Sequence, residues 1–117
     1  TIGGTVWHDR NRNGVRDSGE SVLPNVPIYL YWDSNGNQLL DAADILQATQ
    51  FTNSQGTYQF ANIQPGMYIV RQINLDGYFS ITLDVVPVTV TSGATYTINF
   101  GDHPFYRAYV PMLIRRW

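Results

Sequence analysis

Short runs in which apolar side chains occupy every second position recur along this chain and are separated by turns rich in Gly, Pro and Asn. The clearest run covers residues 26–32, and a period of two residues is typical of a strand that buries one face. Comparable runs cover residues 5–7, 46–52, 57–60, 67–71, 85–91 and 94–100. No long stretch shows helical periodicity. The pattern predicts an all-β chain of seven or eight short strands, folded as an antiparallel β-sandwich.

Only Ser92 and Gly93 separate the last two runs, so we expect those runs to pair as a hairpin. A length of 117 residues fits one sandwich domain, which we place at residues 1–103. Residues 104–117 form an apolar and basic C-terminal segment. We expect this segment to supply an extra strand, either to its own sandwich or to a neighbouring molecule.

The net charge and the absence of cysteine and lysine exclude several kinds of binding and cross-linking. The net charge of −2 argues against general affinity for nucleic acid or membranes, and no stretch has the length of a membrane-spanning helix. The absence of cysteine excludes disulfides and thiolate metal sites. Lysine is also absent, because all seven basic residues are arginine. A cross-link or Schiff base that needs a lysine amine is therefore impossible.

Residues 9–20 match the twelve-residue calcium loop D-x-[DN]-x-[DN]-G-x5-E at every specified position. Ca²⁺ prefers six to eight oxygen ligands, and acidic or amide side chains at alternate positions can aim oxygens at one point. Gly14 takes the sharp turn, and Val15 offers its backbone carbonyl. The predicted ligands are Asp9, Asn11, Asn13, Val15, Asp17 and Glu20.

A second acidic stretch at residues 33–44 fits the same template less well. Gln38 stands where the template has glycine, and the shorter Asp44 stands where Glu closes the loop. We predict either a weaker Ca²⁺ site or a solvated hairpin loop with a helical turn over residues 42–45. Because the two stretches bracket one strand, they should form separate sites. The ligands of the weaker site would be Asp33, Asn35, Asn37, Leu39, Asp41 and Asp44.

Several short motifs accompany the first loop. They are Gly4-Thr5-Val6-Trp7 before it, Leu23-Pro24-Asn25-Val26 after it, then Gly56-x-Tyr58-x-Phe60, Ile63-x-Pro65-Gly66-x-Tyr68-x-Val70, Gly77-Tyr78 and Phe100-Gly101. Together with the loop, these motifs resemble the B-type repeats of bacterial serine-aspartate-repeat surface proteins (SdrD B-like).

The resemblance implies a Cna B-like, prealbumin-like β-sandwich that is secreted or displayed at the cell surface and rigidified by Ca²⁺. Such domains serve as stalks or spacers in surface adhesins, and the resemblance assigns the calcium ligands to the first loop. Some relatives of this fold form a Lys–Asn isopeptide bond, which this chain cannot form without lysine. Its stability must therefore come from packing and metal.

Residues 105–117 have no counterpart in the repeat. A stretch this apolar does not stay exposed in a soluble protein without cost. It could pack on its own sandwich, be donated to another copy to build a filament, or act as a sorting or anchoring tag. The side chains predicted to bind a partner are Phe105, Tyr106, Tyr109, Val110, Met112, Leu113, Ile114 and Trp117.

Catalysis is not expected, because neither His8 nor His103 has an evident nucleophile or acid partner in the sequence. We expect His103 to lie in a connector over residues 101–104. The leading hypothesis is a non-enzymatic, calcium-stabilised structural module of a bacterial surface assembly, which associates with itself or with neighbouring domains. The alternative is an adhesin module that binds protein or glycan, for which Tyr29, Tyr31 and Trp32 could provide an aromatic face.

Overall fold

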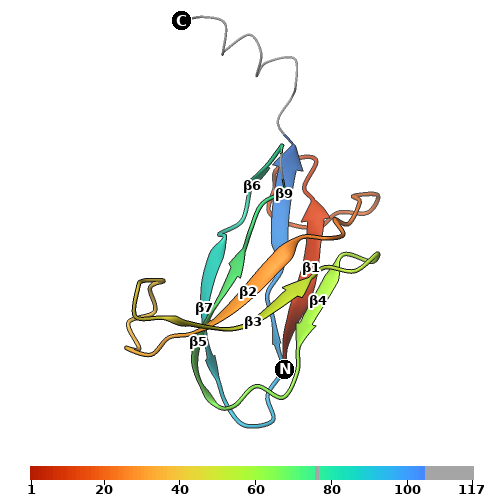
Figure 1. The fold of residues 1–117 in the computed structure, drawn as a ribbon. Helices are drawn as coiled ribbons and strands as arrows, with labels where there is room; N and C mark the ends of the chain where they lie inside the picture. The colour runs from red at the N-terminus through yellow and green to blue at the C-terminus, as the bar shows by residue number, and fades with distance from the viewer. Residues whose placement is uncertain (76, 105–117) are drawn as a thin grey trace, which may run out of the picture.

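The computed structural model describes residues 1–75 and 77–104, and within these residues every regular element is a strand. Two sheets pack face to face, with long loops projecting from the sandwich (Figure 1). In the described part of the chain, no helix has the length and apolar character needed to cross a membrane. The strands are β1 (Ile2–His8), β2 (Pro27–Trp32), β3 (Ile45–Phe51), β4 (Thr57–Phe60), β5 (Gly66–Gln72), β6 (Tyr78–Ser80), β7 (Val85–Val90), β8 (Tyr96–Thr97) and β9 (Phe100–Pro104).

The predicted β-sandwich is confirmed, with nine strands in the described residues where seven or eight were expected. One sheet has the order β4-β1-β9-β6, with β8 also paired to β1, and the other has the order β3-β2-β5-β7. The second sheet is antiparallel throughout, whereas β1 pairs in parallel with both β8 and β9. Pro104 belongs to β9, one residue beyond the predicted domain boundary, which stays a prediction.

Strands β8 and β9 run along β1 as one interrupted strand. Ile2 pairs with Tyr96 and Val6 with Phe100, which is the same offset along the chain. Between these pairs, the Ile98 N–H donates to the Gly3 carbonyl at 2.8 Å. The amide oxygen of Asn99 accepts the Thr5 N–H at 2.8 Å, in place of a backbone carbonyl. A side chain thus fills the gap in the ladder.

The predicted hairpin around Ser92 and Gly93 is wrong. Strand β7 pairs with β5, so Val90 lies opposite Gly66, whereas β8 pairs with β1 in the other sheet. The two residues therefore belong to a connection that carries the chain from one sheet to the other. Local alternation marks both segments as extended but does not say which strands they join.

The core between the sheets contains the aliphatic side chains of the alternating run, Val26, Ile28 and Leu30, all at most 1% exposed. Trp32, the last apolar residue of that run, is 43% exposed because it lies at the end of β2. The remaining buried members of the core are Ile2, Val6, Leu23, Tyr58, Phe60, Tyr68, Val70, Val90 and Phe100.

A buried polar cluster accompanies this core at β9, where the sequence predicted only a connector over residues 101–104. Asp102 is fully buried, and the Gln72 amide nitrogen lies 2.7 Å from its Oδ1 and 2.6 Å from its Oδ2. The same nitrogen also donates to Asn74 Oδ1 at 2.8 Å, and Ser80 donates to Asp84. Burial raises the pKa of Asp102 to about 6, so its charged form is disfavoured.

A substitution at Gly4 tests the close approach of β1 to the last strand. A Cβ on Gly4 would lie 1.9 Å from the Ile98 carbonyl oxygen, which is backbone and cannot rotate away. We expect Gly4→Ala to lower the free energy of unfolding by about 2–3 kcal/mol in urea titrations. Thr97→Ala, at an exposed position of β8, is the control. Equal stability of the two variants would contradict the close contact.

The buried carboxyl of Asp102 predicts a pH dependence. Between about pH 4 and 6 the folded state retains a proton that the unfolded state has lost, so this group makes stability fall as pH rises. Asp102→Asn cannot ionise, and the Gln72 Oε1, buried without a partner, can turn to accept from the new amide. The difference in free energy of unfolding between the variant and the native chain should therefore grow, in favour of the variant, by about 1–3 kcal/mol as the pH rises from 4 to 7. Urea unfolding in EDTA measures this difference, and a difference that is constant with pH would refute it.

Candidate metal centre

The first loop leaves the end of β1 and returns beside it. The His8 N–H donates to the Ser21 carbonyl at 2.8 Å, and Trp7 forms an isolated bridge with Val22. On the other side, the Asp9 N–H donates to the Asp102 carbonyl at 2.7 Å. The loop is thus fixed at both ends to the sheet, and its first residue is fixed to β9.

Asp9 is the centre around which the first loop turns. It is fully buried, its Oδ2 accepts the Gly14 N–H at 2.7 Å, and its Oδ1 accepts the Asn13 N–H at 3.3 Å. Gly14 has a φ of +77°, a conformation that glycine adopts without strain. The predicted turn at Gly14 is therefore hydrogen-bonded to Asp9, the first predicted ligand.

Glu20 closes the loop from its other end. Its Oε1 accepts the Asp17 N–H at 2.8 Å, and its Oε2 accepts the Arg10 N–H at 2.8 Å. These backbone hydrogen bonds, that from Asp17 first, hold the pKa of Glu20 below its usual value. The carboxylate is thus kept in the charged form that a cation requires.

The amide side chains of the loop converge on Asp17. Its Oδ2 accepts from Asn11 Nδ2 at 2.7 Å and from Asn13 Nδ2 at 2.8 Å. An amide group turned about its last bond would present oxygen where it now presents nitrogen. Five of the six predicted positions thus contribute a side chain to one hydrogen-bond network. Val15, the sixth, is 60% exposed and donates its N–H to Asn13 Oδ1 at 3.0 Å.

The second loop repeats this network. Asp33 is buried and its Oδ2 accepts the Gln38 N–H at 2.8 Å, as Asp9 accepts from Gly14. The Asp41 N–H donates to Asp44 Oδ2 at 3.0 Å, as the Asp17 N–H donates to Glu20. The other matching contacts are Asn35 Nδ2 to Asp41 Oδ2 at 3.1 Å, Asn37 Nδ2 to Asp41 Oδ2 at 2.7 Å, and the Leu39 N–H to Asn37 Oδ1 at 3.0 Å.

The missing glycine of the second loop is explained by the backbone. Both loops have a positive φ at their fourth and sixth positions: 60° at Arg12 and 77° at Gly14, then 64° at Gly36 and 62° at Gln38. Glycine has therefore moved from the sixth position to the fourth, while the path of the chain is kept. A single hydrogen-bonded turn precedes β3, in which the Asp44 N–H donates to the Asp41 carbonyl at 3.1 Å.

Two carboxylate oxygens of the second loop are buried without a hydrogen-bond partner. They are Oδ1 of Asp33 and Oδ1 of Asp44, the first and last predicted ligands. A buried carboxylate oxygen is costly unless a donor or a cation satisfies it. Both atoms thus fit ligands of a hard cation. The pKa of Asp41 is lowered by its hydrogen bonds from the Asn35 and Asn37 amides.

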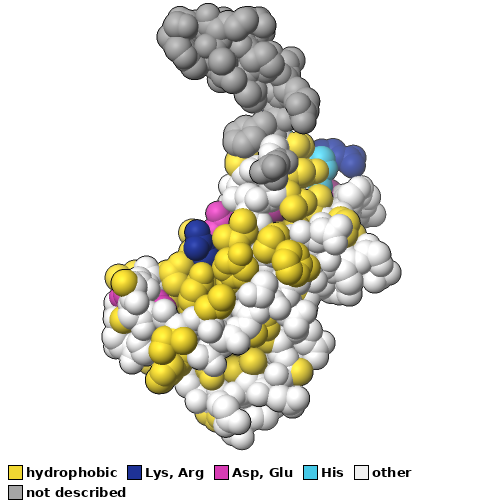
Figure 2. Space-filling view, in the orientation of Figure 1, with side chains coloured by type: hydrophobic (Ala, Val, Ile, Leu, Met, Phe, Trp, Pro, Cys, Tyr) yellow, Lys and Arg dark blue, Asp and Glu magenta, His cyan; other side chains and the backbone are white. Residues whose placement is uncertain are grey.

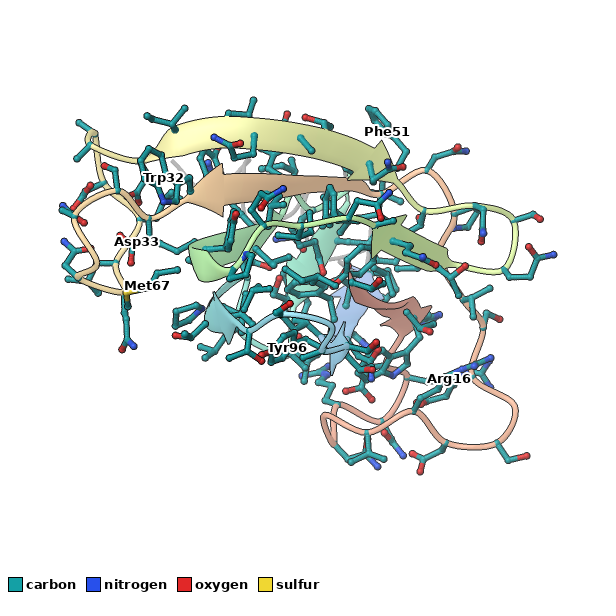
Figure 3. The ribbon with its side chains drawn as sticks, turned by 90° about the horizontal axis from the view of Figure 1, so that it is seen from below. Arg16, Trp32, Asp33, Phe51, Met67 and Tyr96 are labelled. Carbon is teal, nitrogen blue, oxygen red and sulfur yellow. The ribbon has the colours of Figure 1, made fainter. Side chains whose placement is uncertain are left out.

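The two loops lie at opposite ends of β2, as predicted. Figure 3 places Asp33 at one end, beside Met67, and Arg16 of the first loop far from it. The Asp33 N–H donates to the Met67 carbonyl at 2.9 Å, so β5 supports the second loop as β9 supports the first. Two sites here would be structurally independent.

Across residues 1–75 and 77–104, no three His, Asp or Glu side chains lie close enough to form a ready-made metal cluster. In each loop, backbone N–H groups and Asn amides stand between the carboxylates instead. The donor set nevertheless consists of oxygen atoms alone, the chemistry that Ca²⁺ selects over transition metals. The residues therefore fit Ca²⁺ in type and order along the chain.

Sequence reasoning missed the histidine contacts behind the first loop. His103 is buried, and its Nδ1 lies 2.9 Å from the Asp9 carbonyl oxygen. The His8 ring lies 5.7 Å from the His103 ring, and burial, followed by the charge of His103, lowers the pKa of His8. These rings support the loop, and only the pairing of β1 with β9 could have revealed this.

The aromatic residues proposed as a sugar-binding face do not share one face. Tyr29 and Tyr31 stack edge to face with ring centroids 6.2 Å apart, and both are half-buried. Trp32 follows directly in the strand and therefore points to the other face. The partner-binding residues predicted within 105–117 lie outside the described residues.

Comparison with known proteins places the chain in a family. The model of the SdrD B-like domain matches residues 1–86. Serine-aspartate repeat-containing protein D of Staphylococcus aureus (strain Newman) is 34% identical over 93 residues, which are 80% of this chain and 6% of that protein. Colossin-B of Dictyostelium discoideum is 38% identical over 74 residues, 63% of this chain and 2% of that protein. The chain thus spans a small part of these relatives.

Solved structures share the fold at low identity. The shaft pilin SpaA of Lactobacillus rhamnosus GG is 13% identical with a TM-score of 0.65, over 90% of this chain and 51% of that chain. The minor pilin GBS52 of Streptococcus agalactiae is 20% identical with a TM-score of 0.60, over 90% and 44%. The family match covers most of the sandwich and includes both acidic loops. The chain therefore belongs to the SdrD B-like domain family.

Proposed function

We propose that this chain is an extracellular structural module of a bacterial cell-surface assembly and that Ca²⁺, bound in its two acidic loops, stiffens it. Family membership and the pilins among its fold neighbours support a place in a surface assembly. The observation that carries the calcium proposal is the repeated loop network, in which buried carboxylates lie at equivalent positions.

The first loop would hold the ion with Asp9, Asn11, Asn13, Asp17 and Glu20 side chains and the Val15 carbonyl. Three of these groups are formally negative, so they repel one another when no cation is bound. The ion would supply positive charge at the point where the loop now uses amide N–H groups. The second loop would use Asp33, Asn35, Asn37, Asp41 and Asp44 with the Leu39 carbonyl.

The oxygen donor atoms of the loops and the proposed extracellular location both favour calcium over other metals. The loops offer only oxygen, and the chain contains no cysteine. Extracellular calcium modules have Kd values of roughly 10⁻⁴ to 10⁻³ M, so millimolar calcium outside the cell fills even weak sites. Secretion and calcium dependence therefore support one another in this proposal.

The mechanical consequence follows from where the loops are attached. The first loop joins β1 to β2 across the two sheets, and the second joins β2 to the edge strand β3. A bound ion in each loop would fix both ends of β2 to its neighbours. We infer that the module resists mechanical force and performs no catalysis. His8 and His103 would then serve only to pack behind the first loop.

Self-assembly is a second proposed function, in which residues 105–117 contact another copy. It is favoured by the apolar outer surface of the second sheet, where Phe51 is 60% exposed and Leu46 is 51% exposed. Large exposed apolar side chains on a sheet are typical of an interaction surface.

Calcium should raise the melting temperature. At a concentration one hundred times the Kd, each site adds about 2.7 kcal/mol, which for this size raises Tm by about 10 °C. Asp17→Asn and Asp41→Asn should each remove the contribution of one loop to this rise in Tm, because the substitution removes a carboxylate but keeps the shape of the side chain. Differential scanning calorimetry in 10 mM CaCl₂ and in EDTA measures the shift.

Gln55→Ala, in the turn between β3 and β4, is the matched control and should keep the full shift. The same Tm in calcium and in EDTA for the native chain would reject the structural role of the metal. A shift that survives in both Asp variants would place the ion elsewhere.

The glycine exchange between the loops generates a separate prediction. Gln38 holds a φ of +62°, which costs a non-glycine residue about 1 kcal/mol. Gln38→Gly should therefore stabilise the folded chain by a few tenths to about 1 kcal/mol and tighten calcium binding by the second loop. Gly14→Ala, at the equivalent position with no atom within 4 Å of the new Cβ, should lose a similar amount. Isothermal titration calorimetry and urea unfolding measure both, and effects of the same sign would contradict this account.

A further inference from the structure

The outward-facing side of the β3-β2-β5-β7 sheet carries a row of apolar side chains. Cross-strand partners lie on the same side of a sheet, so Tyr31, Leu46, Ile69 and Pro87 form one row across all four strands. Ile69 is fully buried yet lies outside the cluster of buried residues that forms the core. Figure 2 shows hydrophobic side chains gathered over β2 and β3, with a basic group among them. We call this surface the outer face.

Strand β3 is the least protected edge next to this face. The other edge strands are shorter or interrupted: β4 has four residues, β6 has three, and β7 contains Pro87. Strand β3 has seven residues with neither proline nor charge. Natural edge strands usually carry such features to block pairing with another chain. A bulge near Leu46 is the one irregularity in its pairing with β2.

The open edge of β3 presents backbone groups to solvent. The Thr52 N–H donates to the Val26 carbonyl, toward the inner neighbour of this edge. Because N–H groups alternate sides along a strand, those of Thr49 and Phe51 point away from β2. Ile45, Leu46 and Phe51 are 49%, 51% and 60% exposed. An added strand would therefore find both hydrogen-bonding groups and apolar contacts.

The distribution of charge along the chain indicates which segment could bind at the edge of β3. Residues 1–104 carry four arginines against nine acidic residues, whereas residues 105–117 carry three arginines, no acidic residue and mostly apolar side chains. The segment is complementary to the body of the chain in both charge and hydrophobicity. We propose that the free edge of β3 and the outer face bind residues 105–117 of a second copy as an added strand. This proposal rests on the proposed self-assembly and names its acceptor.

The distribution of charge also gives the direction of the added strand. Asp41 and Asp44 lie immediately before β3 begins at Ile45, and Arg115 and Arg116 lie near the end of the segment. An antiparallel arrangement places these arginines beside the acidic loop. A parallel arrangement places them near Phe51 and the uncharged turn at residues 53–56. The added strand is therefore antiparallel to β3.

The first test uses the full chain with a charge on the edge. Leu46→Lys should weaken self-association at least tenfold, because it places a charge in the proposed contact. Leu83→Lys makes the same change at a side chain 75% exposed, beyond β6 and away from β3, and should leave association unchanged. Sedimentation velocity measures the assemblies, and the Tm in CaCl₂ shows that each variant is folded.

A native chain that stays monomeric would reject self-assembly itself. Assemblies that survive Leu46→Lys would reject only the proposed acceptor. Neither result changes the calcium dependence of Tm, which tests the metal proposal separately.

The second test fixes direction and exploits the absence of native cysteine. Full chains with Ile114→Cys are mixed with chains of different mass that carry either Gln47→Cys or Gln50→Cys. The antiparallel arrangement predicts a mixed disulfide dimer with Gln47→Cys and little with Gln50→Cys. The reverse pattern would overturn the direction, and assemblies that form neither disulfide would overturn the site. A chain with both Gln47→Cys and Ile114→Cys that closes on itself when dilute would show that the segment binds its own sandwich, against the proposal.

Discussion

Carboxylates gathered in two short loops impose the main constraint on this sandwich. Asp9 is fully buried and Asp33 is 3% exposed, and each is the first of three acidic residues in its loop. Like charges so close together need donors or a cation to balance them. Backbone N–H groups and Asn amides supply part of that balance, but Asp33 and Asp44 each retain a buried oxygen without a partner. A hard divalent cation bound there, as proposed, would satisfy both oxygens.

Backbone hydrogen bonds attach each acidic loop to a strand of one of the two sheets. Asp9 is hydrogen-bonded through its backbone to Asp102 and His103 of β9, so the first loop is attached to the strand that runs beside β1. Asp33 is attached in the same way to Met67 of β5. Each end of β2 therefore leads to a loop that is hydrogen-bonded to a strand beside it, and an ion bound in each loop, as proposed, would stabilise both sheets.

The first loop and the core face of β2 were predictable from the sequence, because both follow from the spacing of residues close together in the chain. The first loop follows the residue spacing of the calcium-loop template, and the period-two run at Val26, Ile28 and Leu30 predicts the core face of β2. The mismatch at Gln38 conceals the shared backbone path of the two loops, because Gly36 takes over one of the two positive φ positions. The pairing of β8 and β9 with β1 was not predictable, since it joins residues at opposite ends of the sequence. For the same reason, the sequence predicts a connector where Asp102 and His103 are in fact buried in β9.

In the proposed function, each acidic loop binds one calcium ion. Anomalous diffraction from a crystal grown in millimolar CaCl₂, recorded at a long wavelength where calcium scatters anomalously, tests it most directly. We expect an anomalous peak within each loop, surrounded by the oxygens of Asp9 to Glu20 and of Asp33 to Asp44, with the Asn amides turned to present oxygen. Absence of both peaks, with Asn11 and Asn13 still donating N–H groups to Asp17, would contradict it.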